Sequence, residues 1–564
     1  MQLSMEFRTG QFEAGAPGPG MLSAAMSTPS AAHPSRTHNR LLALLVLAFV
    51  VVAGSAMLRT STTFDEIVFS AVGARGIVTG DFSLVNDHPR LPQYLFGLPV
   101  YLSGAEYPSE KGHAWHWLER YDYARQLFWG LGNDSERFVL VTRLVGLAFG
   151  TLTVIAAFFL GKPHLGAGAA LFAAALVAFL PDMLAHSGVA YNDIVLAFGV
   201  LGSAYALDSA VRAPAPGRVA LAALACALTA CTKYSGLIVG PLAIGLLLLE
   251  ALSGRWRDRA WLRAILLGAP IFIGVCYAAI ALVYLGDWRL ADFTRGLGEL
   301  LHTSSGRVGY LLGERRTDGW WYFFPVALAL KTPVALHLLA LLAIIGAWVA
   351  GRGGSWREWA GHRARAPALG AALFIGALLV SGMNIGSRHA LPAMPLLCIL
   401  VAQGIATIWE RGRAAARGAL ALVFATYMLS TLLHYPYFLS YLSEYAAGRP
   451  LHETLVDSST DWGQGLVALR AFMRERGIDV VALAYFGSAL PEGYGIGYVA
   501  LPSFLELPPK PEGPGVPRYA VVSATLLSGT YLDGDLYAAM RAVKPFAVVA
   551  DTLYVYDLEA LGKL

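Results

Sequence analysis

Two adjacent segments near the start of the chain decide its fold: LLALLVLAFVVVAGSAML at residues 41–58 and RTSTTFDE at residues 59–66. The first is an unbroken apolar run that is just long enough to cross a bilayer as a helix. It exceeds the core of a cleaved signal peptide, so we interpret it as an uncleaved first membrane helix. The second segment then emerges at a membrane surface with two neighbouring carboxylates, Asp65 and Glu66.

The composition is that of a polytopic membrane protein. Of the 564 residues, 56% are hydrophobic and only 14% are charged, whereas soluble proteins carry about a quarter of charged residues. The net charge of +4 is small for this length, which argues against nucleic-acid binding. The cysteines lack the spacing of a metal or redox motif and read as core residues; they are Cys226, Cys231, Cys276 and Cys398.

Further apolar runs follow the first one, each near the length of a membrane helix. They cover residues 138–160, 165–185, 193–211, 218–231, 235–252, 261–285, 333–350, 368–382, 390–409 and 419–439. Because the hydrocarbon core offers no water to backbone groups, these runs must be helices rather than open sheet. The sequence therefore predicts an α-helical polytopic membrane protein with about 11 transmembrane helices.

The basic residues predict the orientation of these helices. With a cytoplasmic N-terminus, every inner loop carries Lys or Arg, as the positive-inside rule requires. These residues are Lys162, Arg212, Arg218, Arg255, Arg257, Arg259, Arg352, Arg357, Arg363, Arg365, Arg411, Arg413 and Arg417. The outer loop 286–319 also holds five arginines, partly balanced by five acids. We interpret that excess as a candidate functional feature.

The chain divides into three parts. Residues 1–38 are rich in Gly, Pro, Ala and Ser, and we expect a disordered tail. Residues 39–439 form the transmembrane domain, with outer loops at 59–137 and 286–332. Residues 440–564 lie outside and form a small α/β domain, with a helix at 462–476 and strands at 480–486, 519–523 and 553–556.

Asp65 and Glu66 have both a structural and a chemical interpretation. Thr63 and Glu66 have the spacing of a capping box at a helix start. One of two adjacent carboxylates could instead take a proton from an acceptor hydroxyl while its neighbour caps the helix. Asp193 is likewise either an N-cap of its helix or a second site acid, and the predicted topology places it on the side of Asp65.

A phosphate-bearing substrate needs cations on the same side. Arg143 lies inside the outer end of the second helix, Lys233 at the turn between the fifth and sixth helices, and Arg388 and His389 at the turn before the tenth. Each of them alone could extend to the membrane interface. Together they suggest convergence on a phosphate.

The segment GWWYFFP at residues 319–325 has the composition of an interfacial aromatic belt. Burial of Lys331 in mid-bilayer would cost about 2.5–3.5 kcal/mol. We therefore predict an interfacial helix over 319–331 that leaves Lys331 at the headgroup level. The side chains of Trp320, Trp321 and Tyr322 are then candidates for the substrate pocket.

These motifs resemble the protein O-mannosyltransferase-like family, glycosyltransferase family 39 of the GT-C fold, in its bacterial members. The resemblance covers most of the chain in order. It rests on Phe64-Asp65-Glu66, Gly73, Thr79-Gly80-Asp81, His88-Pro89, Gly130-Leu131-Gly132-Asn133-Asp134 before Arg143, Thr232-Lys233-Tyr234-Ser235, Gly319 to Pro325 with Lys331-Thr332-Pro333, Asn384-Ile385-Gly386 with Arg388-His389, and Val456-Asp457-Ser458 with Asp461-Trp462-Gly463-Gln464.

The resemblance implies a sugar donor on a polyprenyl monophosphate, an inverting transfer, and a catalytic acid in the first outer loop, which maps to Asp65 with Glu66 beside it. It also implies an integral protein of the bacterial inner membrane. Relatives read His-Pro-Pro-Leu with a Lys two residues on, whereas this chain has Arg90 for the second Pro and Gln93 for that Lys. Arg90, next to the pocket residue His88, is a candidate source of the missing charge.

We therefore expect transfer of a sugar from a polyprenyl monophosphate to an acceptor hydroxyl on the extracytoplasmic face. The acceptor could belong to a protein, a lipid or a glycan. A divalent cation such as Mg or Mn near Asp65 is a further hypothesis, although the acids show no ligand spacing that requires one. The alternative is a transporter or flippase for the same lipid, which would favour charges at mid-membrane and repeat symmetry.

Overall fold

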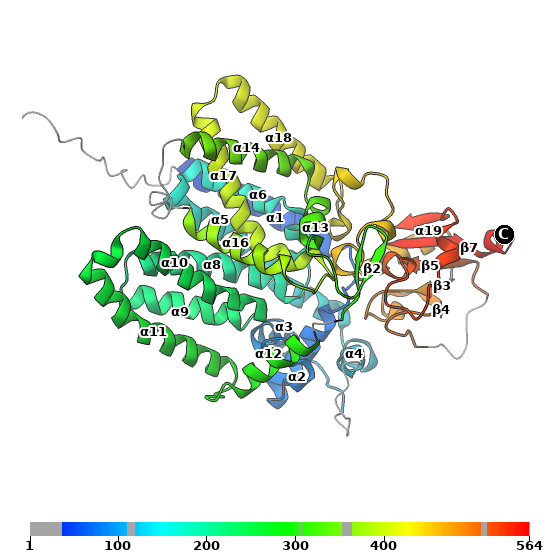
Figure 1. The fold of residues 1–564 in the computed structure, drawn as a ribbon. Helices are drawn as coiled ribbons and strands as arrows, with labels where there is room; N and C mark the ends of the chain where they lie inside the picture. Colours follow the sequence, from blue (N-terminus) through cyan, green and yellow to red (C-terminus); the bar gives the residue numbers. More distant parts are fainter. Residues whose placement is uncertain (1–35, 110–118, 304–305, 352–363, 509–515, 563–564) are drawn as a thin grey trace, which may run out of the picture.

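The protein is described by a computed structural model that covers residues 36–109, 119–303, 306–351, 364–508 and 516–562. A helical bundle forms most of it, and a small α/β part lies at one end, next to the first outer loop (Figure 1). The predicted disordered tail lies outside the described residues except for its last three, which belong to helix α1 (Arg36–Met57). The α-helical membrane fold with a C-terminal α/β part is therefore confirmed.

Seven helices in the described part of the chain are long and apolar enough to cross a membrane. They are α1, α5 (Ser135–Leu165), α8 (Asn192–Arg212), η3 with α10 (Tyr234–Leu252), α11 (Arg259–Val283), η5 with α17 (Ser387–Arg411) and α18 (Ala414–Leu432). Two bent pairs raise the number to nine if each pair is one span. The helices α9 (Pro216–Ala230) and α16 (Arg365–Leu379) are apolar but shorter, and the predicted total of about eleven stays a prediction.

Two pairs of apolar helices are each bent at a short break, one within the apolar run 165–185 and one between the segment 319–331 and the run 333–350. One is α6 (Ala167–Ala178) with α7 (Pro181–Ser187), bent by 65°, and the other is α13 (Phe323–Lys331) with α14 (Val334–Gly351), bent by 113°. Proline explains the breaks, because Pro181 and Pro333 lack an N–H for the preceding turn and disfavour helical geometry in the residue before them. The second break turns Lys331 into the protein.

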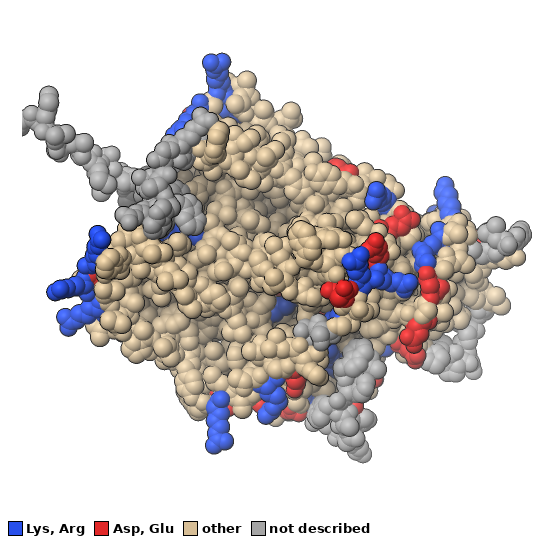
Figure 2. All heavy atoms as spheres, in the orientation of Figure 1, with Lys and Arg blue, Asp and Glu red and all other residues tan. Residues whose placement is uncertain are grey.

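Charged residues gather at the ends of the bundle and leave a broad uncharged surface between them (Figure 2). The end away from the sheet carries mainly Lys and Arg, whereas the surface near the sheet mixes both signs. Exposed Arg257 lies between α10 and α11, exposed Arg259 begins α11, and exposed Arg413 and Arg417 lie at the start of α18. These are inner-loop residues in the predicted orientation.

The first outer loop folds into short helices against the bundle. They are α2 (Glu66–Thr79), η1 (Ser83–Val85), α3 (Arg90–Leu102), α4 (Glu119–Arg125) and the π-turn η2 (Gln126–Gly130). Two glycines let α2 and α3 touch: a Cβ on Gly73 would lie 1.9 Å from the Gln93 carbonyl oxygen, and one on Gly97 would lie 2.2 Å from Gly73. This close packing fixes the start of α2, where Asp65 lies.

The C-terminal part is a small α/β layer. Its sheet has the order β4-β3-β5-β7-β6, with β3 parallel to β4 and β5, and β7 antiparallel to β5 and β6. The predicted strands appear as β3 (Val480–Ala484), β5 (Tyr519–Ser523) and β7 (Leu553–Asp557), and the predicted helix as α19 (Leu466–Glu475). The sequence did not predict the strands β4 (Gly497–Ala500) and β6 (Ala547–Val549).

Shorter elements complete the fold. The amphipathic helix α12 (Ala291–Thr303) and the hairpin of β1 (Gly309–Leu311) and β2 (Glu314–Arg316) lie between α11 and α13. The remaining short helices are η4 (Arg255–Arg257), η6 (Phe438–Ser440), η7 (Glu444–Ala446), η8 (Leu451–Glu453), η9 (Asp457–Ser459), η10 (Pro491–Tyr494), α20 (Ala524–Leu527), α21 (Ala538–Arg541) and α22 (Leu558–Leu561). The segment between η9 and α19 reaches back to the first outer loop.

Candidate active site

The segment before Asp65 is held by the C-terminal part of the chain. The Ser61 N–H donates to the Gln464 carbonyl over 3.0 Å, and the Phe64 N–H donates to the Trp462 carbonyl over 2.8 Å. The Ser61 hydroxyl adds a bond of 2.8 Å to the Gly463 carbonyl. Residues some 400 positions apart in sequence thus lie side by side, and the α/β part helps to place Asp65.

Glu66 is fully engaged in a buried ion pair. Its carboxylate lies 2.6 Å from Arg143 Nε and accepts the Thr63 N–H over 2.9 Å, which is half of the predicted capping box. The Arg143 guanidinium also donates to the carbonyls of Met57, Thr60 and Ser61. Glu66 and Arg143 therefore neutralise each other and connect α2 to α5.

This pair gives a stability prediction. Replacement of Glu66 by Ala should lower the free energy of unfolding by about 3–5 kcal/mol, because it leaves the Arg143 charge buried without its partner. Thermal unfolding of the detergent-purified protein measures the change. The control is Glu136→Ala in the first turn of α5, where the side chain is exposed. Equal unfolding temperatures for Glu66→Ala and the wild type would contradict the interpretation.

Asp65 points the other way, into open space. Its carboxylate accepts the Tyr121 hydroxyl over 2.9 Å and lies 3.5 Å from Arg388 Nη2. The side chain is 23% exposed, whereas that of Glu66 is 2% exposed. Of the two adjacent acids, only Asp65 is accessible to a substrate.

The predicted cations Lys233 and Arg388 meet beside Asp65, together with Asp193. Lys233 Nζ lies 2.5 Å and Arg388 Nη1 lies 3.3 Å from the Asp193 carboxylate. Asp193 makes no side-chain cap at the start of α8; it binds these two cations. His389 Nδ1 lies 3.4 Å from Lys233 Nζ.

Two aromatic rings hold the Arg388 side chain. Its guanidinium carbon lies 4.2 Å from the Trp462 ring centroid and 4.7 Å from that of Tyr191. The residue is only 4% exposed. A guanidinium between two aromatic faces is restricted to one orientation, so Arg388 keeps a fixed position in the lining of the two cavities described below.

Two further arginines at the site were not singled out from the sequence. Arg120, in α4, lies 3.0 Å from Asp87, and Arg307 follows α12. Arg307 belongs to the outer loop 286–319, and the excess of basic residues in that loop was the only feature of the sequence that pointed to it.

Burial alone would raise the pKa of Asp87, but His88 and Arg120 outweigh it and hold that pKa below its usual range. Burial lowers the pKa of His88 to about 4, so its imidazole is neutral at neutral pH.

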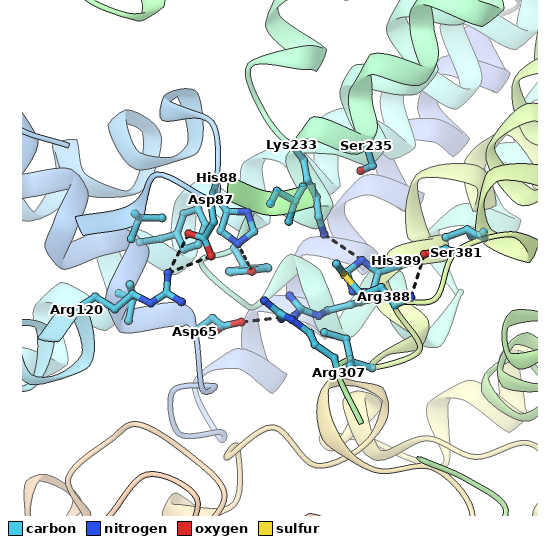
Figure 3. A pocket seen from close by; sticks show the side chains of 18 of the residues that line it. Asp65, Asp87, His88, Arg120, Lys233, Ser235, Arg307, Ser381, Arg388 and His389 are labelled. Carbon is cyan, nitrogen blue, oxygen red and sulfur yellow. Dashed lines mark hydrogen bonds and ion pairs between the residues drawn. The ribbon is translucent and has the colours of Figure 1, made fainter. Parts of the chain in front are cut away.

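Asp65 stands where two cavities meet. The first, which we call the bundle-side cavity, has a volume of about 240 Å³ and contains the side chains of Asp65, Lys233, Arg307, Arg388 and His389, which point toward one another (Figure 3). Its four cations outnumber its two carboxylates; the charged residues are Arg120, Lys233, Arg307, Arg388, Asp65 and Asp87. Its far wall is apolar, with Phe324 from α13 and Phe374 and Leu378 from α16.

The second, which we call the domain-side cavity, has a volume of about 750 Å³. It shares Asp65, Arg120, Arg307 and Arg388 with the first. Its other wall comes from the C-terminal part of the chain, through Asp457, Trp462, Phe486, Phe504 and Tyr531. Asp65 is therefore accessible from both sides.

Several predicted site residues lie elsewhere. Arg90 lies 2.5 Å from Asp292 and 4.6 Å from the Tyr284 ring centroid, and it lines neither cavity. His88 does line the bundle-side cavity. The aromatic residues Trp320, Trp321 and Tyr322 line neither of the two; Trp320 is buried and Trp321 is 69% exposed. Arg143 is also absent from both linings.

Lys331 corrects the prediction of a headgroup position. Its ammonium is fully buried, 3.2 Å from Asp182, and donates to the carbonyls of Leu439 and Tyr441. A lysine that finds a carboxylate and two carbonyls inside the protein does not need to reach the interface. Lys331 lines neither cavity.

The described residues contain no group of three or more His, Cys, Asp or Glu side chains that could hold a metal ion. At the junction of the cavities, Asp65 and Asp87 each already have an arginine partner. At Asp65, the groups that could bind a metal ion are therefore limited to one carboxylate, which is surrounded by cations.

Comparisons with known proteins agree with the sequence motifs. Residues 42–294 match the model of the family described as dolichyl-phosphate-mannose-protein mannosyltransferase. This region runs from α1 into α12 and contains Asp65, Asp193 and Lys233. No curated protein matches the sequence.

Two solved structures illustrate the distant likeness of folds. ArnT from Cupriavidus metallidurans bound to undecaprenyl phosphate has a TM-score of 0.49 and 13% identity, over 92% of this chain and 98% of that chain. The archaeal oligosaccharyltransferase AglB from Archaeoglobus fulgidus, in complex with an inhibitory peptide and a dolichol-phosphate, has a TM-score of 0.43 and 13% identity, over 71% and 56%. Both are too distant to assign residues here.

The family match and the ordered motifs lead to the same assignment. Residues 42–294 of the chain are similar to the dolichyl-phosphate-mannose-protein mannosyltransferases, the family that the sequence motifs also resemble.

Proposed function

We propose that this protein is an inverting glycosyltransferase that moves a sugar from a polyprenyl monophosphate to an acceptor hydroxyl on the extracytoplasmic face. The observation that carries the proposal is the position of Asp65, an accessible carboxylate at the junction of a cationic cavity and a larger one. One cavity can hold the donor while the other admits the acceptor.

The bundle-side cavity fits the phosphate of the donor. With Asp193 included, four cations face three carboxylates, an excess that favours the single negative charge of the donor's phosphodiester and the second charge that develops as it leaves. The apolar residues of α13 and α16 offer a path for the lipid chain. Arg388 and Lys233 lie closest to Asp65 and Asp193. They would stabilise the negative charge that grows on the phosphate as it leaves.

Asp65 would act as the general base. Its carboxylate would take the proton from the acceptor hydroxyl, whose oxygen then attacks the anomeric carbon from the face opposite the phosphate. The bond between the anomeric carbon and the phosphate oxygen breaks, and its electron pair leaves with the polyprenyl phosphate. A single displacement of this kind inverts the anomeric configuration.

The charge distribution supports the extracytoplasmic face. The basic ends of α10, α11 and α18 lie at the end of the bundle away from the sheet, as expected for cytoplasmic loops. Asp65 lies at the other end, beside the α/β part. Nucleotide sugars are absent from that side of the membrane, so a lipid-linked donor is the fitting chemistry. A mannosyl donor remains the candidate that the family description favours.

Lipid binding tests the donor site. Native mass spectrometry of the purified protein with undecaprenyl phosphate should show one bound lipid, and Lys233→Ala should weaken its binding by about tenfold or more, the loss expected for one charge-assisted contact. Arg449→Ala is the matched control, because Arg449 is exposed and lies outside both cavities. Equal lipid binding by Lys233→Ala and the wild type would refute the donor site.

A further inference from the structure

The domain-side cavity differs from the bundle-side cavity in charge. Its carboxylates number four and its cations three: Asp65, Asp87, Glu299, Asp457, Arg120, Arg307 and Arg388. A cavity with no excess of positive charge gives no preference to an anionic ligand. The two halves of the site are therefore suited to different molecules.

Aromatic rings form the wall that the C-terminal part contributes. Phe504 and Tyr531 are partly exposed, their ring centroids lie 5.1 Å apart, and both line the cavity beside Phe486 and Trp462. Aromatic rings next to carboxylate and guanidinium groups can pack on the C–H face of a sugar ring while the polar groups bind its hydroxyls. A polyhydroxylated neutral molecule matches both kinds of surface.

Asp457 is the polar centre of this wall. It accepts the Tyr531 hydroxyl and the Ser458 N–H, and it lines the same cavity as Asp65. Both Asp457 and Tyr531 have positive φ angles, 55° and 70°, a conformation that costs energy in residues other than glycine and is typical of functional sites. Burial raises the pKa of Asp457 to about 6, so it is ionised at neutral pH and can accept hydroxyl hydrogen bonds.

The cavity offers little to a peptide backbone. Peptides commonly bind by adding a strand to a free sheet edge. None of the residues that form β1 to β7 lines this cavity. Among the residues that the structure describes, the polar residues of this lining carry carboxylates, guanidinium groups, hydroxyls, one amide (Asn86) and one indole N–H (Trp462).

We propose that the domain-side cavity is the acceptor site and that the acceptor is a neutral carbohydrate, bound through Asp457 and Tyr531 with one hydroxyl directed at Asp65. This inference rests on the proposed function. That hydroxyl oxygen forms the bond to the anomeric carbon of the donor sugar and gives its proton to Asp65. The volume of about 750 Å³ lies within the range of about 300–1,000 Å³ of small-molecule sites, which suits a few sugar residues.

Binding of three classes of probe tests the proposal. The protein in nanodiscs, saturated with undecaprenyl phosphate, is examined by saturation-transfer NMR with a panel of neutral trisaccharides of mannose, glucose and galactose. The same trisaccharides carrying a phosphate, and a peptide rich in Ser and Thr, are the competing classes. We expect at least one neutral trisaccharide to bind, and more tightly than its phosphorylated form and the peptide.

Variants locate that binding. Asp457→Asn and Tyr531→Phe should each weaken binding of the neutral trisaccharide, the former by about tenfold or more, the effect of losing a charge-assisted hydrogen bond. Glu453→Gln, an exposed acid in the same segment, should leave it unchanged. Undecaprenyl phosphate binding, measured in parallel, should be the same in all four proteins and shows that the variants are folded.

The possible outcomes separate the two proposals. Preference for the phosphorylated sugar or the peptide, or no binding of any neutral sugar by protein that holds the lipid, overturns the acceptor class and leaves the donor site intact. Unchanged sugar binding in Asp457→Asn overturns the acceptor site. Failure to bind undecaprenyl phosphate at all would instead refute the proposed function.

Discussion

Asn in place of Asp65 is expected to lower the rate of sugar transfer by about 100- to 10,000-fold, the usual contribution of a general base. The substitution removes the basic carboxylate oxygen but keeps a side chain of the same size. The Asn amide oxygen can still accept the Tyr121 hydroxyl, which Asp65 accepts over 2.9 Å. The side chain is partly exposed, so little loss of stability accompanies the loss of rate.

The measurement uses a purified protein with a radiolabelled polyprenyl-phosphate sugar, and it follows both transfer and lipid binding. Asp65→Asn should bind the lipid as the wild type does, because in the proposed site the cationic side chains, and not residue 65, bind the phosphate. Asp122→Asn is the control, an exposed acid in α4. Transfer by Asp65→Asn at the wild-type rate would remove the proposed mechanism.

The second large effect is expected at Arg388. Its replacement by Ala should lower kcat by about 100- to 1,000-fold, the range seen when one donor to a developing negative charge is removed. The kcat of Arg388→Lys should lie between the values for the wild type and Arg388→Ala. A lysine keeps the charge but not the planar group that lies 4.2 Å from the Trp462 ring centroid. Arg388→Ala should also weaken lipid binding, unlike Asp65→Asn.

Arg90→Ala is the informative control for this series. The sequence motifs make Arg90 a candidate donor ligand, but in the structure it pairs with Asp292 outside both cavities. Its loss should change transfer by less than about threefold, a change of less than about 1 kcal/mol, because this partly buried pair lines neither cavity. A fall as large as that of Arg388→Ala would show that Arg90 acts at the site and that the cavity assignment is wrong.

The sequence predicted the general architecture for a physical reason. Long apolar runs have only one stable solution in a bilayer, so the helices around Asp65 could be recognised. The contact of Lys233 and Arg388 near Asp65 could be proposed because the membrane topology places each loop on one of only two sides of the membrane. The family resemblance pointed to Asp65 as the acid, but the pairing of Glu66 with Arg143, 77 positions away, could not be inferred from the sequence.

The misplaced residues share one cause. The prediction for Lys331 compared only two positions of its side chain, in the hydrocarbon core and at the headgroups. The contact with Asp182, on a separate helix, could not be inferred from the sequence. Arg120, in α4, was missed because it lies in a polar stretch of the sequence, where a lysine or arginine carries no special signal; only its contact with Asp87 places it at the site. Tertiary pairing of charges is specified by three-dimensional position, which local patterns do not contain.

The central claim is tested most directly by a cryo-EM structure of the Asp65→Asn protein with an intact polyprenyl-phosphate sugar. We predict density for the phosphate in the bundle-side cavity, in contact with Lys233 and Arg388, and the anomeric carbon next to residue 65. Phosphate bound at another place, with residue 65 turned away from the sugar, would contradict the account.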